Sequence, residues 1–234
     1  MQPASIKSER TDTRSRFLST LMIILALVVF CALFVVADQG YNRFINLRFP
    51  GVGESTPLAN IYGLLSRLHL LIPAALLILW RPRLFGFQVG RTFQYWKLIL
   101  LLLTINCAVI GGYLWLSGGT PYSGNQWLLT EVVTVPVVEE TIWRGLVFTV
   151  LYSALKKSHP DSYAMRWSVV LSGLAFGLLH AANILAGVPL QFVVLQTLNA
   201  LVWGLVYGYA RARTESIYPP MLLHAAMNLV VVFF

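Results

Sequence analysis

The apolar run Phe17–Val36 constrains the fold most, because it is 20 residues long and contains no charged residue. A helix of about 20 apolar residues crosses the hydrocarbon core of a bilayer. Six further apolar stretches follow along the chain: Pro57–Trp80, Lys97–Ser117, Leu128–Leu155, Trp167–Leu185, Leu190–Ala210 and Ile217–Phe234. These stretches are continuously apolar rather than alternating, which disfavours a β-barrel. The sequence predicts an all-α, polytopic transmembrane bundle of about seven spans.

The composition agrees with a membrane protein. Hydrophobic residues make up 57% of the chain and charged residues 11%, whereas soluble domains average about 45–50% apolar and about 25% charged residues. Both a soluble globular fold and a disordered chain are therefore disfavoured. The formal net charge of +8 would suggest nucleic acid in a soluble protein. Here the charges mark membrane topology, so the expected surroundings are a lipid bilayer and no nucleic acid.

The basic residues alternate from side to side as the positive-inside rule requires. With the N-terminus inside, only Arg43 and Arg48 fall outside, and Arg67 and Arg144 lie within spans. The inner segments hold the remaining basic residues: Lys7, Arg10, Arg14, Arg16, Arg81, Arg83, Arg91, Lys97, Lys156, Lys157, Arg166, Arg211 and Arg213. We therefore predict an N-in, C-out orientation in the cell (inner or plasma) membrane.

Three regions are expected along the chain. Residues 1–16 form a cytoplasmic basic tail, residues 17–127 the N-terminal helices and loops, and residues 128–234 a C-terminal transmembrane core. The first span reads as an uncleaved anchor, because its apolar run is too long for a typical signal peptide. Residues 39–56 are expected to form an interfacial loop. Arg67 and His69, in the second span, are expected to reach the lipid headgroups.

The fourth predicted span carries charged residues that are costly in lipid. Glu140 and Arg144 are four residues apart, so they lie about 40° apart around a helix and can pair. Glu139 lies about 140° from Arg144 and remains the less neutralised carboxylate. Pro136, one turn earlier, frees a backbone carbonyl and can bend the helix at this point.

Two other predicted spans supply polar residues at helical spacing. Phe176 and His180 share a face of the fifth span, and His224 and Asn228 share a face of the seventh. Carboxylates, imidazoles and an amide form a hydrolytic set, in which acid–base groups activate water and donors stabilise an oxyanion. Gly173 and Gly177 predict a close helix approach beside His180, as small residues do in membranes.

Other intramembrane proteases need motifs that the sequence lacks. There is no His-Glu-x-x-His motif of a zinc protease, no Gly-x-Ser-Gly, and no Gly-x-Gly-Asp. Of the protease chemistries considered, the glutamate and histidine residues alone supply the necessary groups.

These motifs, taken in order, resemble a known family. Glu139-Glu140-x-x-x-Arg144, Phe176-x-x-x-His180 and His224-x-x-x-Asn228 are similar to the motifs of the CAAX protease and bacteriocin-processing family of intramembrane endopeptidases. That family includes the type II CAAX prenyl endopeptidases, whose members receive prenylated peptides from the cytoplasmic side. The resemblance covers roughly residues 128–230.

The resemblance implies a role for each residue. Glu139 would be the catalytic glutamate and would activate water together with His180, while His224 and Asn228 would form the oxyanion site. Glu140, Arg144 and Phe176 would shape the cavity. The implied function is a glutamate-type endopeptidase that cleaves a membrane-associated peptide or protein and needs no cofactor. The ligand types alone leave zinc as a minor alternative.

Two other functions use the same residues. Buried glutamate and histidine pairs also serve proton-coupled membrane transporters, although the sequence shows no convincing inverted repeat. A non-catalytic immunity or scaffold protein could retain the same fold. A transporter predicts proton-coupled flux in liposomes, whereas an endopeptidase predicts cleavage that depends on Glu139.

Overall fold

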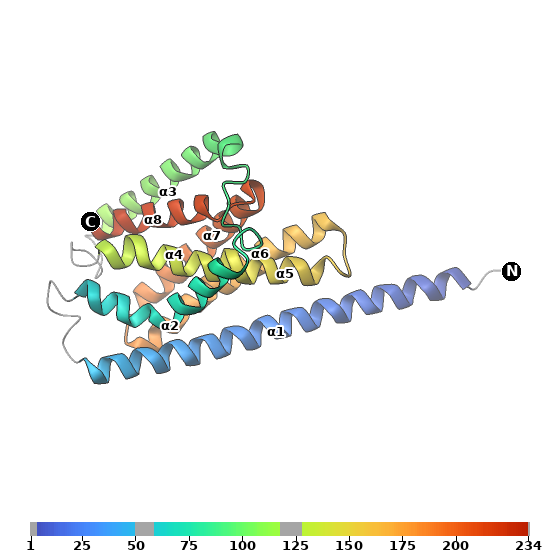
Figure 1. Ribbon diagram of the computed structural model, residues 1–234, viewed down its shortest axis with the longest axis horizontal. Helices are drawn as coiled ribbons and strands as arrows, with labels where there is room; N and C mark the ends of the chain where they lie inside the picture. The colour runs from blue at the N-terminus through green and yellow to red at the C-terminus, as the bar shows by residue number, and fades with distance from the viewer. Residues whose placement is uncertain (1–3, 50–58, 118–127, 234) are drawn as a thin grey trace.

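The computed structural model describes residues 4–49, 59–117 and 128–233. The described residues are almost entirely helical and contain no strand, which confirms the all-α prediction. The N-terminal end of α1 and the C-terminal end of α8 lie at opposite ends of the molecule (Figure 1). The main helices are α1 (Ala4–Arg48), α2 (Ala59–Trp80), α3 (Trp96–Ser117), α4 (Val135–Glu140), α5 (Phe148–Leu155), α6 (Asp161–Leu179), α7 (Leu190–Thr214) and α8 (Tyr218–Phe233).

Four further helical segments have a different hydrogen-bonding pattern. Two are π-helical, η4 (Leu128–Thr134) and η5 (Thr141–Val147), and two are 3-10 helical, η2 (Thr92–Tyr95) and η6 (His180–Ala186). The segments η4, α4, η5 and α5 follow one another without a break and form one helical run across the bundle. This run carries both glutamates of the predicted site.

The helices match the predicted crossings. Five helical stretches are long and apolar enough to span a membrane: Ser15–Arg48, Gly63–Trp80, Thr92–Leu116, Asp161–Ala186 and Leu190–Thr214. The run from η4 to α5 and the shorter apolar helix α8 complete the expected layout within the described residues. Hydropathy alone therefore places the crossings in their correct order.

Two predicted boundaries are wrong. The interfacial loop expected from residue 39 onward is helical, because α1 continues to Arg48; its remainder from residue 50 lies outside the described residues. Gly40 is a weak helix breaker, costing about 1 kcal/mol, and the burial of Ile45 holds this part of α1 in place. The fifth span begins at Asp161 rather than Trp167, directly after Pro160. Because the first turn of this helix is polar, a hydropathy profile does not detect its start.

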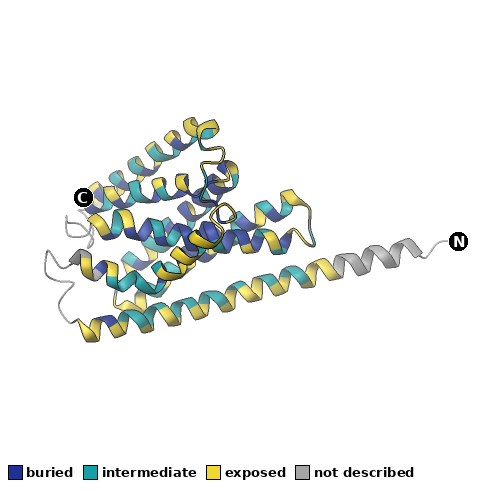
Figure 2. Ribbon diagram, viewed as in Figure 1, coloured by how far each residue is buried: buried dark blue, intermediate teal, exposed yellow. Residues whose placement is uncertain are grey.

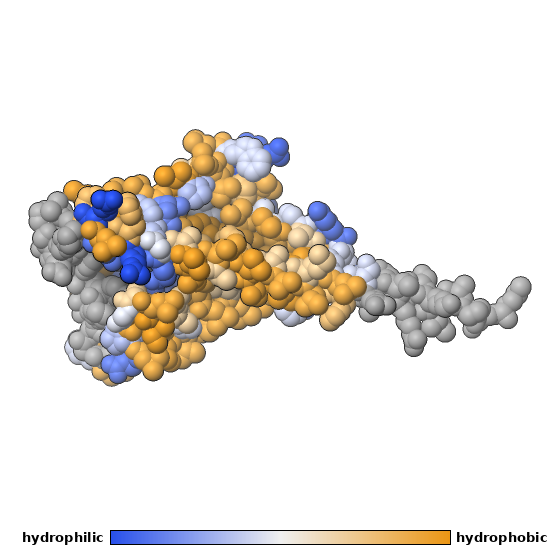
Figure 3. All heavy atoms as spheres, turned by 90° about the horizontal axis from the view of Figure 1, so that it is seen from below, coloured by the Kyte–Doolittle hydropathy of each residue, from blue (hydrophilic) through white to orange (hydrophobic). Residues whose placement is uncertain are grey.

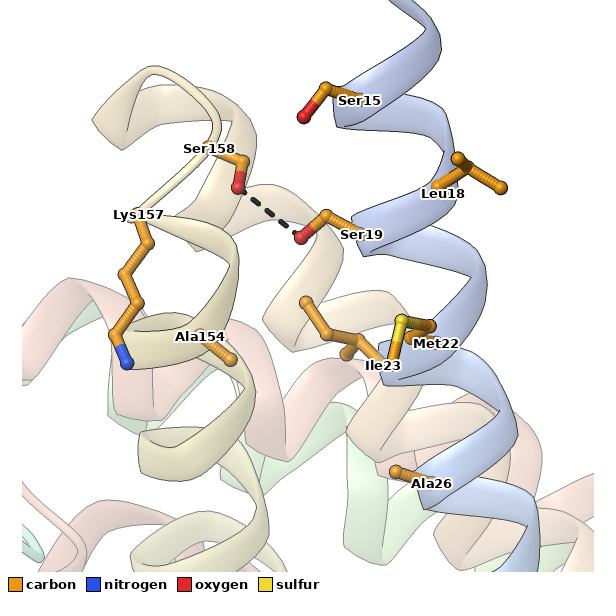
Figure 4. A pocket seen from close by; sticks show the side chains of 9 residues that line it. All are labelled: Ser15, Leu18, Ser19, Met22, Ile23, Ala26, Ala154, Lys157 and Ser158. Atoms are coloured by element: carbon orange, nitrogen blue, oxygen red, sulfur yellow. Dashed lines mark hydrogen bonds between the residues drawn. The ribbon is translucent and has the colours of Figure 1, made fainter.

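The predicted inner segments meet at one side of the bundle, from which the N-terminal end of α1 projects (Figure 1). Arg91 and Glu215 form an ion pair at 3.3 Å, which joins the segment before α3 to the end of α7. On α1, Ser19 lies 3.2 Å from Ser158 of the α5–α6 turn, across the mouth of a groove of about 700 Å³ (Figure 4). These contacts agree with a common membrane face for the basic segments.

Helices α6 and α7 pack closely against each other. A Cβ atom added at Gly177 would lie 2.6 Å from the Leu201 Cα, and one at Gly204 would lie 2.8 Å from the Gly173 carbonyl oxygen. Real Cβ atoms do not approach backbone so closely, so glycine is required at these positions. The predicted close approach at Gly173 and Gly177 is confirmed. It fixes α6, and hence His180 at its end, against α7.

Pro136 lies at the start of α4, directly after the π-helical segment η4. A proline has no N–H, and in π geometry the partner of that missing donor is the carbonyl five residues earlier, that of Glu131. The side-chain amide of Asn228 donates to this carbonyl at 2.7 Å. The freed carbonyl predicted from Pro136 is therefore present, and α8 supplies its donor.

The burial pattern agrees with a membrane environment. Buried residues concentrate where the run from η4 to α5 meets α6, α7 and α8, and exposed residues follow the outer face of α1 (Figure 2). Hydrophobic residues cover the middle of the face seen in Figure 3, and hydrophilic residues gather toward its ends. An apolar belt between polar ends is the surface that a bilayer requires.

Candidate active site

A fully buried ionic cluster lies at the centre of the bundle. The Arg144 guanidinium donates to Glu140 Oε1 at 3.2 Å, and His224 Nδ1 lies 2.9 Å from the same oxygen. The side chains of Glu140 and Arg144 are completely inaccessible to solvent. The predicted pairing of Glu140 with Arg144 is confirmed. A charge buried this deeply needs such partners, because an unpaired ion in low dielectric is very costly.

Arg144 connects this cluster to two neighbouring helices. Its guanidinium donates to the Gly204 carbonyl on α7 at 3.0 Å and lies 4.2 Å from the centre of the Phe176 ring on α6. A cation over an aromatic face adds stabilisation of about 2 kcal/mol where water is excluded. Arg144 thus holds α4, α6 and α7 together around the predicted site.

Glu139, the residue before Glu140, has no such ion-pair partner among the residues that the structure describes. It lines a cavity of about 100 Å³, together with His180, Arg67 and Asp38. Its Oε2 atom is buried and has no hydrogen-bond partner. A cavity needs only about 15 Å³ of such space to hold a water. A buried polar atom without a protein partner beside a polar cavity is the arrangement that binds water.

The backbone fixes the protonation pattern of His180. Its Nδ1 lies 2.9 Å from the carbonyl oxygen of Phe176, one turn earlier on α6. A carbonyl can only accept, so Nδ1 carries the proton and the neutral ring keeps its lone pair on Nε2. The Phe176 ring packs edge-on against His180, with centroids 4.8 Å apart. His180 therefore lines the cavity as an oriented imidazole with a basic nitrogen.

The structure does not bring all four predicted catalytic residues onto this cavity. His224 and Asn228 are buried and are absent from its lining residues. His224 bonds to Glu140 and stacks on Tyr207 at 5.5 Å, while Asn228 bonds to the Glu131 carbonyl. Phe176 connects the two groups, since its ring also lies 6.0 Å from that of His224.

Two residues of the cavity were missed by the sequence analysis. Arg67 was expected to reach the headgroups but lines the cavity with Glu139, and Asp38, just before the expected loop, was not singled out. Asp38 continues a face of α1 that includes Phe30 and Phe34 at four-residue spacing. Both rings pack against Trp143 of η5, at 6.1 and 5.7 Å. This spacing is the sequence signal that could have identified Asp38.

His69 was also expected to contact lipid headgroups, and the structure gives it partners within the protein. Its Nε2 lies 3.0 Å from Asp38 Oδ1, and its ring packs against Tyr41 at 4.3 Å. The Tyr41 hydroxyl donates to the Leu65 carbonyl at 2.9 Å. These contacts hold the outer part of α1 against α2, because two polar side chains near lipid are satisfied by each other. They also orient the Asp38 carboxylate beside the cavity.

Two polar residues near His180 bind each other across helices. The Asn183 amide on η6 donates to Gln196 Oε1 on α7 at 2.8 Å, and Asn183 also lines the cavity. Among the described residues, no group of three histidine, cysteine, aspartate or glutamate side chains is arranged to hold a metal ion. The cysteines Cys31 and Cys107 are free thiols.

Comparison with known proteins identifies the region that holds this site. Residues 122–230 match the family model described as Type II CAAX prenyl endopeptidase Rce1-like. The chain therefore carries a CAAX protease family domain. No curated protein and no solved structure matches the chain.

The CAAX protease match begins six residues before the region predicted from the motifs and ends at the same residue, 230. It spans both glutamates, both histidines and Asn228, and it excludes Asp38, Arg67 and the rest of α1 to α3. At the level of the family, this match supports an intramembrane endopeptidase. Together with the long apolar helices, it makes the chain an integral membrane protein.

Proposed function

We propose that the chain is a glutamate-type intramembrane endopeptidase in which Glu139 and His180 activate the attacking water. One observation carries this proposal: an unpaired carboxylate and an oriented imidazole line the same small cavity. General acid–base catalysis needs groups that can exchange protons with a bound water. Glu140 is unsuited to this role, because it does not line the cavity and its Oε1 atom is bound by both Arg144 and His224.

The proposed reaction is peptide hydrolysis. A water held between Glu139 and His180 loses a proton to this pair as its oxygen attacks the carbonyl carbon of the scissile bond. The resulting tetrahedral intermediate carries an oxyanion. When the C–N bond breaks, the leaving amine takes the proton back from the pair, and the products are a carboxylic acid and an amine.

The oxyanion donors are proposed to be His224 and Asn228. With Nδ1 of His224 bonded to Glu140, Nε2 is the ring nitrogen left for substrate, and it would donate to the oxyanion when it carries a proton. The Asn228 amide nitrogen has two hydrogens, so its bond to Glu131 leaves one for substrate. Because neither side chain lines the cavity, this role requires the substrate to reach past Phe176.

The substrate is proposed to be a membrane-associated peptide or protein, and the enzyme to reside in the cell membrane. The polar cavity lies inside an apolar belt, so the cleaved bond must enter from the lipid or from its interface (Figure 3). Three substrate classes are suited to such a site: prenylated C-terminal peptides, bacteriocin leaders and membrane-anchored sorting tails.

The proposed mechanism needs no metal ion. Glu139 and His180 supply acid–base groups, and a zinc site would require further ligands at about 2 Å from the ion. We expect cleavage by the purified enzyme to be unaffected by a strong zinc chelator. Loss of cleavage on chelation, with recovery on added zinc, would replace this mechanism with metal-activated water.

The direct test uses purified protein in detergent and peptides of the three substrate classes. We expect Glu139→Gln to abolish cleavage while expression and thermal unfolding remain unchanged. The matched control is Glu131→Gln, a half-buried glutamate on the same helical run that does not line the cavity. Full cleavage by Glu139→Gln would end this proposal.

A further inference from the structure

The cavity lies toward one end of the helices that line it. Asp38 is on the outer part of α1, Arg67 on the first half of α2, and His180 at the end of α6. The chain enters α1 and α6 from the basic face and leaves α2 toward it, as the arrangement in Figure 1 shows. All three residues therefore lie far from the basic face along their own helices.

Helix geometry gives the distances. At about 1.5 Å per residue, His180 lies about 28 Å from the start of α6 at Asp161, and Arg67 about 20 Å from the end of α2 at Trp80. The hydrocarbon core is about 30 Å thick, so its midplane lies about 15 Å from either face. A typical tilt of about 20° shortens these heights by less than a tenth. The cavity therefore lies beyond the midplane.

The first helix gives the same result independently. Thr20 of α1 contacts His159 in the α5–α6 turn at 2.8 Å, which places Thr20 near the basic face. Asp38 follows 18 residues later, about 27 Å further along the helix. Asp38, His69 and Tyr41 form their polar contacts at this height, where an apolar run gives way to interface.

The basic face is the cytoplasmic one. The segments with most of the Lys and Arg residues gather there and contact one another. A bias this large sets orientation in membrane proteins.

We infer that the catalytic cavity is reached from the extracytoplasmic face, and that its substrates are membrane-anchored polypeptides cleaved at that face. The substrate half of this inference rests on the proposed function, whereas the access half does not. Access from the extracytoplasmic face is the opposite of the cytoplasmic access that the family resemblance implies. A prenylated C-terminus in the cytoplasm would have to cross most of the bilayer to reach Glu139.

Thiol labelling tests the access half without any cleavage. In a chain with Cys31→Ser and Cys107→Ser, single cysteines are placed at Asn183 in the cavity, at Gln191 on the exposed start of α7, and at Ser162 on the exposed start of α6. Intact cells are treated with a charged, membrane-impermeant methanethiosulfonate. We expect Asn183→Cys and Gln191→Cys to react in intact cells, and Ser162→Cys to react only after permeabilisation.

Two results would overturn this inference. One is reaction of Ser162→Cys in intact cells, which would invert the orientation. The other is failure of Asn183→Cys to react in intact cells that modify Gln191→Cys, which would exclude extracytoplasmic access.

Terminal mass spectrometry tests the substrate half. Membrane proteins are compared between cells producing the wild-type enzyme and cells producing Glu139→Gln. We expect termini that require Glu139 to lie on the extracytoplasmic side of single anchors, close to the membrane. Termini confined to cytoplasmic segments would overturn the substrate class while supporting hydrolysis. A complete absence of Glu139-dependent termini would instead contradict the proposed function and leave the labelling result intact.

Discussion

Glu139 and Glu140 are adjacent in the chain but lie in opposite surroundings. Glu140 is sealed in the core and shares one carboxylate oxygen between Arg144 and His224. Glu139 is half-buried and lines a cavity that Glu140 does not reach. One helical step of about 100° separates the two side chains. A compensated charge stabilises the fold, while an uncompensated one is retained for chemistry or for bound water.

The helix changes from α-helical to π-helical geometry directly after Glu139 and Glu140. The α-helical segment α4 ends at Glu140, and the π-helical segment η5 starts at Thr141. Single π turns within α-helices are frequent at functional sites, because they re-aim side chains. Arg144 and Trp143 both lie in η5, one in the ionic cluster and the other on the cavity wall. The π turn thus places neighbouring side chains in separate environments.

The largest effect is expected from Glu139→Gln. Removing a general base lowers rates by about 10²–10⁴, and here we expect cleavage to fall below detection. The unfolding midpoint in detergent should remain at the wild-type value, because this carboxylate has no ion-pair partner to lose. Cleavage rates and thermal unfolding measured on the same preparations check both parts. A large loss of stability would show that Glu139 belongs to the structural cluster.

The next effect is expected from Glu140→Gln, with stability as its main readout. This change leaves the Arg144 charge buried beside a neutral amide, and breaking one side of a buried pair costs about 3–5 kcal/mol. Unfolding by mixed micelles of increasing denaturing detergent would measure the loss. As a control, Glu140→Leu combined with Arg144→Met removes both charges and should regain most of the stability. Wild-type stability in the single variant would contradict a structural role for the cluster.

Much of this fold was predictable because a bilayer imposes simple rules. Continuous apolar length located the crossings, and the alternating basic charge predicts their direction. The Glu140–Arg144 pair followed from four-residue spacing, which survives the change to π geometry. The start of α6 was missed because its first turn is polar, although Pro160 marks it.

The site was less predictable, because its cavity depends on tertiary packing. Arg67 interrupts the second span and Asp38 follows the first apolar run, and only the packing of α1 and α2 against η5 brings them beside Glu139. Likewise, Asn228 was predicted from a motif as an oxyanion donor, but its partner in the structure is a backbone carbonyl freed by Pro136. No local pattern specifies such a partner on another helix.

Asn228→Ala separates these two roles of Asn228. The Glu131 carbonyl would lose its donor, and a buried acceptor left unsatisfied costs about 1–3 kcal/mol. If Asn228 also donates to the oxyanion, kcat should fall by about 10²–10³. The same change is then made in a Pro136→Ala background, in which residue 136 has a backbone N–H that can donate to the Glu131 carbonyl. We expect that background to recover stability but not kcat; recovery of both would limit Asn228 to a structural role.

The smallest effect is expected from Asn183→Ala, which removes the bond to Gln196 between η6 and α7. Interhelical side-chain hydrogen bonds in membranes average about 0.6 kcal/mol. A double-mutant cycle with Gln196→Ala should give a coupling free energy near that value. Asn183 lines the cavity and Gln196 does not, so the two single variants also separate packing from chemistry. Equal, small losses of stability with unchanged cleavage would place Asn183 with the structural contacts, whereas a loss of cleavage confined to Asn183→Ala would place its amide beside the substrate.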